Sequence, residues 1–267
     1  MRSDRRMHFQ IGEGNLGRYV YFYDEVTSTN DVARKLAEEN ASEGTVVVSR
    51  KQSNGRGRNR RHWFSPVGGL WFSLILRPRN GENLTLIPLL SGIAGARAIM
   101  HVTDLEVWLK WPNDLIVENR KLGGILVETM LSKSVPVVIV GVGINVRNSF
   151  AESSEPLRTA ISLHDLGREI EELDVLKNLM HELEWRYELF NEGSIELLLN
   201  EWHAISCMVG KMVSLTDRTG TYQGIALGVD VTGALLLKRT DGSVIAISST
   251  DAISVTIDAG LSEAGAR

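Results

Sequence analysis

Short apolar runs that alternate with polar residues dominate the first half of the chain, and a period of two predicts β-strands. Val46, Val47 and Val48 form one such run, and aromatic and apolar residues fill another at 70–76. The predicted strands of this half lie at residues 19–25, 44–49, 70–76, 106–110, 115–117, 124–130 and 135–142. Turn residues at 112–114 and 118–120 separate the middle strands. The pattern therefore predicts one large sheet.

Apolar residues at helical spacing predict helices at 84–100, 174–190 and 194–205. The segment TSTND, residues 27–31, supplies capping side chains ahead of a further helix that reaches Ala37. Strands interspersed with these helices predict an α+β domain, a mixed β-sheet with helices packed on one side. The polar residues 148–156 predict a mobile loop.

The pattern changes after Met208. Short strands separated by glycine-bearing turns follow, at residues 211–215, 222–228, 234–238, 244–247 and 253–256. Such a series predicts a small SH3-like β-barrel. The predicted organisation is a flexible lead-in at 1–18, a large domain at 19–208, the small β-domain at 209–257 and a tail at 258–267.

Composition narrows the class of protein. The chain has 267 residues and a net charge of −4, which argues against a nucleic-acid protein. One cysteine excludes a disulfide framework and suits the cytoplasm, and the six histidines show no zinc spacing. The N-terminus lacks the apolar core of a signal peptide, and no segment is expected to span a bilayer.

The segment SNGRGRNRRHWFS, residues 53–65, is the most informative part of the chain. Four arginines (Arg56, Arg58, Arg60 and Arg61) crowd into six positions, and such charges repel one another unless an anion binds. Arginine forks onto carboxylate or phosphate, which favours an anion site. A solvated basic loop is the alternative. Predicted strands on both sides favour the site, because functional loops are held on rigid scaffolds.

Three further segments carry candidate chemistry: KWPNDL at 110–115, KLGGILVE at 121–128 and GVGINV at 141–146. Lys121 precedes two glycines that let the backbone approach a ligand, although an isolated lysine there would be read as a surface residue. GVGINV lacks the third glycine and the helix of a dinucleotide fingerprint, so we reject that interpretation. Gly141 and Gly143 are expected to permit close approach of a ligand.

These segments, together with TSTN and in this order, resemble biotin protein ligases, which activate biotin with ATP and transfer it to a lysine of a carrier protein. The resemblance covers about the whole chain. It implies a class II synthetase-like catalytic core and a C-terminal SH3-like domain. It also implies the monofunctional type, without an N-terminal DNA-binding domain, because the predicted catalytic domain begins near residue 19.

The resemblance also implies roles for individual residues. Lys121 and Arg58 are the implied catalytic residues. The implied biotin-binding residues are Ser28, Thr29, Asn30, Gln52, Gly55, Arg56, Lys121 and Gly124. The implied ATP- and adenylate-binding residues are Arg56, Arg58, Arg61, Trp63, Asn113, Asp114, Lys121 and Asn145. For Asp114 we consider Mg²⁺ binding or deprotonation of the acceptor lysine, and for Trp63 a core position is the alternative. Arg60 departs from the family pattern, which has glycine there.

A ligase of this kind uses biotin and ATP as substrates with Mg²⁺, and its partner is a biotin carboxyl carrier protein of a biotin-dependent carboxylase. DNA and membranes are not expected as partners, and a homodimer is possible. Two alternatives stay open. A lipoate–protein ligase shares the core fold and the adenylation chemistry, and a non-catalytic biotin sensor would share the pocket.

Overall fold

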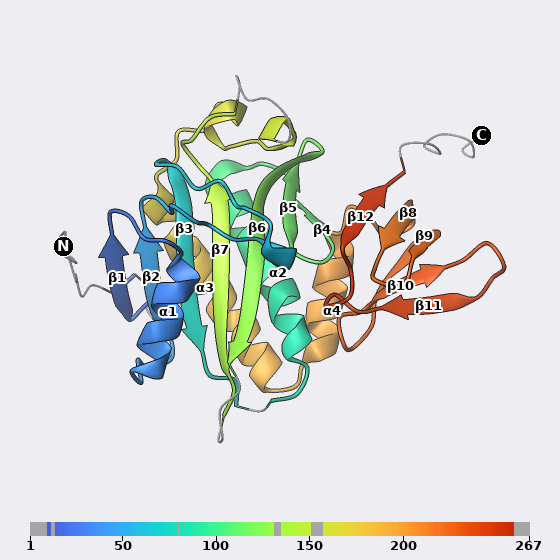
Figure 1. The fold of residues 1–267 in the computed structure, drawn as a ribbon, viewed down its shortest axis with the longest axis horizontal. Helices are drawn as coiled ribbons and strands as arrows, with labels where there is room; N and C mark the ends of the chain where they lie inside the picture. Colours follow the sequence, from blue (N-terminus) through green and yellow to red (C-terminus); the bar gives the residue numbers. More distant parts are fainter. Residues whose placement is uncertain (1–9, 12–13, 80, 131–134, 151–156, 259–267) are drawn as a thin grey trace.

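The computed structural model describes residues 10–11, 14–79, 81–130, 135–150 and 157–258, and its larger part is a seven-stranded sheet (Figure 1). The strand order is β1-β2-β3-β7-β6-β5-β4, and only β1 and β2 pair in parallel. The strands are β1 (Tyr19–Tyr23), β2 (Thr45–Ser49), β3 (Gly69–Leu76), β4 (Trp108–Lys110), β5 (Asp114–Val117), β6 (Arg120–Met130) and β7 (Val137–Asn145). The predicted mixed sheet is confirmed.

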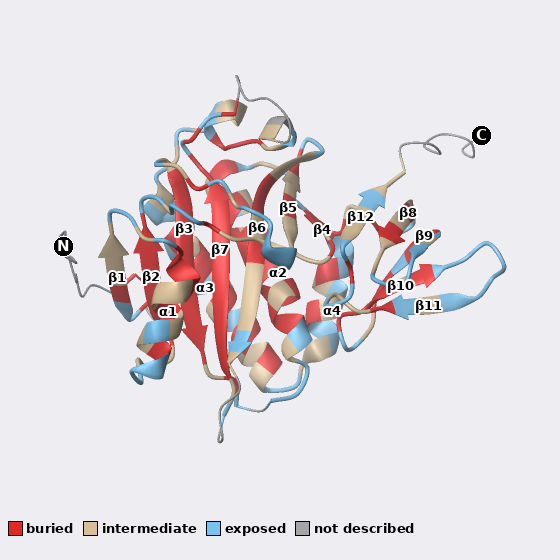
Figure 2. Ribbon diagram, viewed as in Figure 1, coloured by how far each residue is buried: buried red, intermediate tan, exposed pale blue. Residues whose placement is uncertain are grey.

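Alternation along each strand gives the sheet two different faces. Leu70 and Leu74 of β3 belong to the main core, whereas Ile75 of β3 packs with Ala33 and Ala37 of helix α1 (Thr29–Glu38). Most of the helical cover therefore lies on one face, as predicted, and α1 crosses the other face (Figure 1). Strands β3 and β7 are buried along their whole length, so they hold the centre of the sheet (Figure 2).

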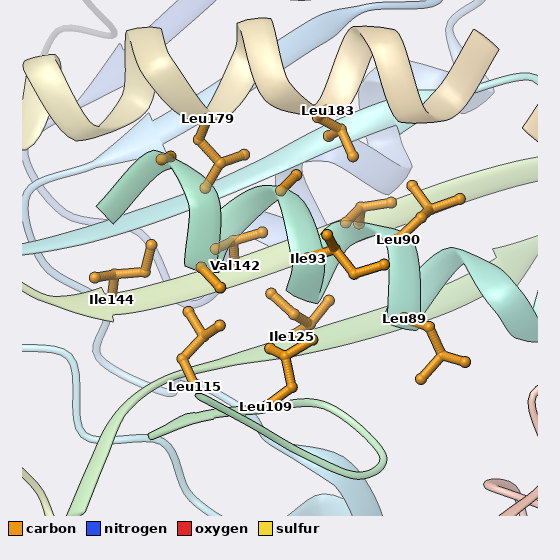
Figure 3. Close-up of a cluster of buried hydrophobic side chains, with 14 of the residues drawn as sticks. Leu89, Leu90, Ile93, Leu109, Leu115, Ile125, Val142, Ile144, Leu179 and Leu183 are labelled. Atoms are coloured by element: carbon orange, nitrogen blue, oxygen red, sulfur yellow. The ribbon is translucent and has the colours of Figure 1, made fainter. Parts of the chain in front are cut away.

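Helix α2 (Ile87–Thr103) lies between the sheet and helix α3 (Glu172–Asn191) (Figure 3). Ile93 and Leu90 of α2 are fully or almost fully buried there. We expected no segment long and apolar enough to span a bilayer. By length and composition alone that expectation is wrong, because the helical segment Leu84–Thr103 has a mean hydropathy of 1.4. Its most apolar window is 67% buried inside the protein, which explains the hydropathy by core packing.

Helix α4 (Ile195–Ala204) leads to a five-stranded antiparallel sheet of order β11-β10-β9-β8-β12, the predicted small β-domain. Its strands are β8 (Met212–Thr216), β9 (Thr221–Val229), β10 (Leu235–Lys238), β11 (Val244–Ile247) and β12 (Ser254–Ile257). Trp111 donates its indole N–H to the carbonyl of Gly233 at 3.0 Å, and His203 Nε2 accepts the N–H of Val229 at 3.2 Å. These contacts fix the small sheet against the large domain.

Three local predictions need correction. Ile11 and Leu16 are 8% and 2% exposed, so part of the lead-in predicted as flexible packs into the core. Asn148 and Phe150 are buried in the segment predicted as a mobile loop, of which residues 151–156 lie outside the described residues. Strand β6 begins at Arg120, four residues earlier than predicted, so Lys121 stands on a strand and not in a turn.

Candidate active site

A cleft of about 510 Å³ opens on the face of the sheet that carries α1. Its walls come from the start of α1, the arginine-rich loop, the hairpin of β5 and β6, and residues 252–256 of the small domain. The predicted site residues that line it are Ser28, Thr29, Asn30, Gln52, Arg56, Arg58, Arg61, Trp63, Asn113, Asp114, Lys121, Gly124 and Asn145. Gly55 is the predicted site residue that does not line it.

Two glycines of β7 form part of the floor of the cleft. Gly141 pairs with Ser73 of β3, and Gly143 pairs with Trp71, so both face the side of α1. A Cβ on Gly141 would lie 2.2 Å from Asn30 Oδ1, and one on Gly143 would lie 2.5 Å from Trp63 Nε1. These glycines were predicted to admit a ligand. In this structure they admit two side chains that themselves line the cleft.

The TSTN segment begins α1 in a different way from the one its capping residues suggest. Ser28 is the N-cap residue, yet its side chain makes no capping hydrogen bond. Ser28, Thr29 and Asn30 are each 3% exposed. All three line the cleft, where the resemblance to biotin protein ligases placed them, and Thr29 and Asn30 also contact Ser73 of the sheet.

Gln52 connects α1 with the far end of the arginine-rich loop. Its Oε1 accepts the backbone N–H of Thr29 at 2.8 Å, and its Nε2 donates to Ser65 Oγ at 2.9 Å. Ser65 donates in turn to the carbonyl of Trp63 at 3.0 Å. Gly55 packs inside this arrangement, since a Cβ there would lie 2.4 Å from the same carbonyl. Its missing side chain serves the loop and not the cleft.

Three of the four arginines of the loop donate to protein acceptors, so protein groups offset part of the crowding of their charges. The two terminal nitrogens of Arg56 contact the two oxygens of Asp31 at 2.7 and 2.6 Å. Hydrogen bonding by Arg56 lowers the pKa of Asp31 below its usual value, and the same pairing raises the pKa of Arg56. Arg56 thus joins the loop to α1.

Arg58 and Arg61 extend the other way, to the small domain. Arg58 donates to the carbonyls of Ser249 and Ala252, and Arg61 donates to the carbonyl of Ile253 at 3.1 Å. Burial lowers the pKa of the Arg58 guanidinium, which indicates a partly dehydrated charge. The loop therefore bridges the two domains across the cleft.

Arg60 stands where the family pattern has glycine, and its backbone explains that preference. Its φ of 58° lies in the left-handed region that glycine adopts without a steric cost. Asn59 beside it has a φ of 55°. The loop of this chain keeps the backbone course that a glycine would favour, with an exposed arginine in its place.

Lys121 Nζ lies 2.6 Å from Asp114 Oδ1 and 5.1 Å from the ring centre of Trp63. A Cβ on Gly124 would lie 3.4 Å from Lys121 Cε, an ordinary van der Waals distance, so the glycine lies directly beside the lysine in the wall of the cleft. Asp114 is first of all the partner of Lys121. Among the described residues, no group of three or more metal-binding side chains surrounds it.

Trp63 is half-buried and belongs to the wall of the cleft, so the alternative of a core position is wrong. Its indole Nε1 is buried without a hydrogen-bond partner in the described structure. Asn113 donates to the carbonyl of Ile125 within the β5–β6 hairpin. Asn145 Nδ2 donates to the carbonyl of Ile161 at 3.0 Å. Both asparagines line the cleft while holding its walls together.

Sequence reasoning missed several residues of the site. It gave Asp31 only a capping role and gave Ser73 and Glu128 none, although Asp31 binds Arg56 and the other two bind Asn30. A carboxylate directly after TSTN was a usable signal, because an arginine-rich loop needs counter-charges. It also placed all site residues before Val146, whereas residues 252–256 of the small domain close one wall.

Comparisons with known proteins agree with this arrangement. Residues 22–145 match the Biotin/lipoate A/B protein ligase family, and residues 209–253 match the Biotin protein ligase C terminal domain. The bifunctional ligase/repressor BirA of Bacillus subtilis is 33% identical over 246 residues, which cover 90% of this chain and 75% of that protein. The biotin–[acetyl-CoA-carboxylase] ligase of Paracoccus denitrificans is 31% identical over 224 residues, which cover 80% and 92%.

Among solved structures, the biotin protein ligase of Aquifex aeolicus in complex with biotin and ATP superposes with a TM-score of 0.79. It is 32% identical, and the match covers 90% of this chain and 99% of that one. Fold and site together define a protein ligase of the biotin/lipoate type. The C-terminal domain and the relatives narrow this class: the chain belongs to the biotin protein ligase family.

Proposed function

We propose that this protein activates biotin with ATP to biotinyl-5′-AMP and transfers the biotin to a lysine of a carrier protein. The observation that carries the proposal is that Lys121, Arg58 and the last three residues of TSTN (28–30) line one cleft. A carboxylate oxygen of biotin attacks the α-phosphorus of ATP, and pyrophosphate leaves. The lysine amine then attacks the acyl carbon, and AMP leaves.

The chemistry of the cleft suits the first step. Two anions meet when the biotin carboxylate approaches the α-phosphate, and negative charge grows on the phosphate oxygens. Lys121, held by Asp114, supplies a fixed cation for that charge. Arg58 supplies a second cation at the border with the small domain. The hydroxyl and amide groups of Thr29 and Gln52 suit a cyclic urea, which has one acceptor and two donors.

Four finer points are proposals of the same kind. The carrier is a biotin carboxyl carrier protein of a carboxylase, which the names of the relatives support. Mg²⁺ would come with ATP and be held mainly by its phosphates. Asp114 has the carboxylate chemistry to contact the ion, although its Oδ1 is engaged by Lys121. A cytoplasmic location suits the unpaired Cys207 and the use of ATP.

The lipoate alternative has less support. The match of residues 209–253 to a biotin protein ligase domain, and the arginine-rich loop that this domain contacts, favour biotin. A non-catalytic biotin sensor would not explain the pair of Lys121 and Asp114 in the cleft, because binding without adenylation needs no fixed cation for phosphate charge. Pyrophosphate release on mixing with ATP and either biotin or lipoate distinguishes all three.

Lys121→Ala tests the catalytic assignment. We expect biotinyl-adenylate formation to slow by about 10²–10³-fold, the usual loss when one such stabilising group is removed. Single-turnover formation of the adenylate is the measurement. Lys51→Ala is a matched control, because Lys51 pairs with Glu25 at an exposed position outside the cleft. A rate for Lys121→Ala within a few-fold of the control would remove Lys121 from this role.

A further inference from the structure

A continuous chain of hydrogen bonds runs beneath the cleft from Glu128 to Gln52. Glu128 Oε2 accepts from Asn30 Nδ2 at 3.0 Å, and Asn30 Oδ1 lies 2.6 Å from Ser73 Oγ. Ser73 Oγ lies 2.8 Å from Thr29 Oγ1. Thr29 donates its backbone N–H to Gln52 Oε1 at 2.8 Å, and its hydroxyl oxygen lies 3.2 Å from the same oxygen. Glu128 and Ser73 do not line the cleft, whereas Asn30, Thr29 and Gln52 do.

Counting hydrogens along this chain gives it a direction. A carboxylate only accepts, so Asn30 must turn its Nδ2 toward Glu128 and its Oδ1 toward Ser73. Two oxygens 2.6 Å apart need a hydrogen between them, and an amide oxygen has none. The single hydroxyl hydrogen of Ser73 therefore lies on Asn30. The contact between Ser73 and Thr29 then requires the hydroxyl hydrogen of Thr29.

The same hydrogen count determines which way the side-chain amide of Gln52 is turned. Ser65 uses its own hydrogen on the carbonyl of Trp63, so it must accept from Gln52 Nε2. Gln52 Oε1 then faces Thr29 and receives its backbone N–H. Because the hydroxyl hydrogen of Thr29 already lies on Ser73, a lone pair of Gln52 Oε1 stays available. The cleft is therefore offered acceptors by both Thr29 and Gln52.

We propose that Glu128 is a positioning residue for biotin binding, which directs the chain Asn30–Ser73–Thr29 so that Thr29 and Gln52 present acceptors to the N–H groups of the ureido ring. The inference rests on the proposed function. Without an acceptor at residue 128, the amide of Asn30 can turn over and donate to Ser73. Thr29 then has to place its hydrogen on Gln52 Oε1 or in the cleft, and an acceptor is lost.

Glu128 also carries a charge that could act apart from its hydrogen bond to Asn30, because Arg34 lies 3.5 Å and Arg56 3.9 Å from its oxygens. Two substitutions separate charge from acceptance. Glu128→Gln removes the charge and keeps an oxygen that can accept from Asn30. Glu128→Met removes both and keeps the length of the side chain. Arg34→Gln is the matched control, because Arg34 contacts Glu128 Oε2, the oxygen that also accepts from Asn30, and does not line the cleft.

The experiment measures the KM for biotin, the KM for ATP and kcat for pyrophosphate release by the full chain. We expect Glu128→Met to raise the KM for biotin about tenfold, the usual effect of an unmade buried hydrogen bond. The KM for ATP and kcat should change less than about threefold, and Glu128→Gln and Arg34→Gln should stay close to wild type. A wild-type protein that releases no pyrophosphate with biotin and ATP would overturn the proposed function and this inference with it. An active wild type leaves the proposed function standing, and the variants then test the inference alone.

Equal biotin defects in Glu128→Gln and Glu128→Met would overturn the assignment, because charge would then be the cause. So would an unchanged KM for biotin in both. If Glu128→Met does not fold, Ser73→Ala carries the test, since Ser73 is buried and touches the chain only at its centre. It leaves Thr29 no acceptor except Gln52, so the same tenfold rise is expected. A folded Ser73→Ala variant with a wild-type KM for biotin would reject the inference.

Discussion

At the scale of single residues, glycines, which have no side chain, shape the cleft as much as the side chains that line it. Gly141 and Gly143 leave room on β7 that Asn30 and Trp63 occupy. The two glycines lie in register with Ser73 and Trp71 of β3. Since directly paired residues of a sheet point to the same face, all four positions face the side of α1. The floor of the site is thus set by the pairing of β3 with β7.

Arg60 gives a prediction at the same scale. A left-handed backbone costs a non-glycine residue roughly 1–2 kcal/mol, and the extra freedom of glycine in the unfolded chain offsets about 0.5–1 kcal/mol of the relief. We expect Arg60→Gly to be as stable as wild type or slightly more stable, and Arg60→Val to be less stable. The measurement is the free energy of unfolding in urea.

The control for Arg60 is Arg50→Gly, at an exposed arginine whose φ is not positive. There the glycine should cost about 0.5–1 kcal/mol, because no backbone strain is relieved. A loss of stability in Arg60→Gly as large as in Arg50→Gly would contradict the strain argument.

At the scale of elements, the arginine-rich loop depends on helix α1 through the pair of Arg56 and Asp31. Asp31→Asn should loosen the loop and speed trypsin cleavage between residues 56 and 61 by several-fold, since local opening governs such cleavage. Asp24→Asn is the control, because Asp24 is exposed and contacts Arg50 at 3.8 Å, outside the site. Equal cleavage of the two variants would show that Asp31 does not hold the loop.

The pKa of Asp31 adds a dependence on pH. Its value in the folded protein lies below the usual 3.8, so the pair contributes its full stability above that pH. The contribution is lost as the pH falls through the folded pKa. The difference in cleavage between wild type and Asp31→Asn should therefore be level across neutral pH. A difference that faded as the pH rose through neutrality would point to another group.

At the scale of the whole molecule, the small domain is a wall of the cleft and an anchor for the arginine-rich loop. Its position depends on close packing at Gly228, where a Cβ would lie 2.1 Å from the ring of His203 in α4. Gly228 also has a φ of 139°, which disfavours other residues. The joint between the domains is therefore sensitive to one added methyl group.

Gly228→Ala should lower the free energy of unfolding by more than the 1–2 kcal/mol or so that backbone strain alone costs. Gly242→Ala is the matched control, since Gly242 has a φ of 86° and nothing within 4 Å of the added carbon. The double variant Gly228→Ala with His203→Ala should recover part of the loss, because the clash is removed. Equal losses at Gly228 and Gly242, with no recovery in the double variant, would show that His203 does not set the joint.

The sequence by itself determined much of this protein, because its signals are local. Apolar alternation set the strands to within a few residues, and helical spacing set α2, α3 and α4. Glycine and arginine at fixed spacing identified the loop and, with four other motifs, the family. Lys121 and Arg58 could be named as cations for phosphate chemistry because residue type alone supplies that charge.

Tertiary structure decided everything that depends on which distant residues meet. Only the pairing of β3, β7 and β6 brings Ser73 and Glu128 beneath Asn30, and only the docking of the small domain places carbonyls beside Arg58. The apolar stretch that could have crossed a membrane became the core helix because two layers bury it. Hydrogen-bond partners and counter-charges are chosen by proximity in space, and a single sequence does not contain those distances.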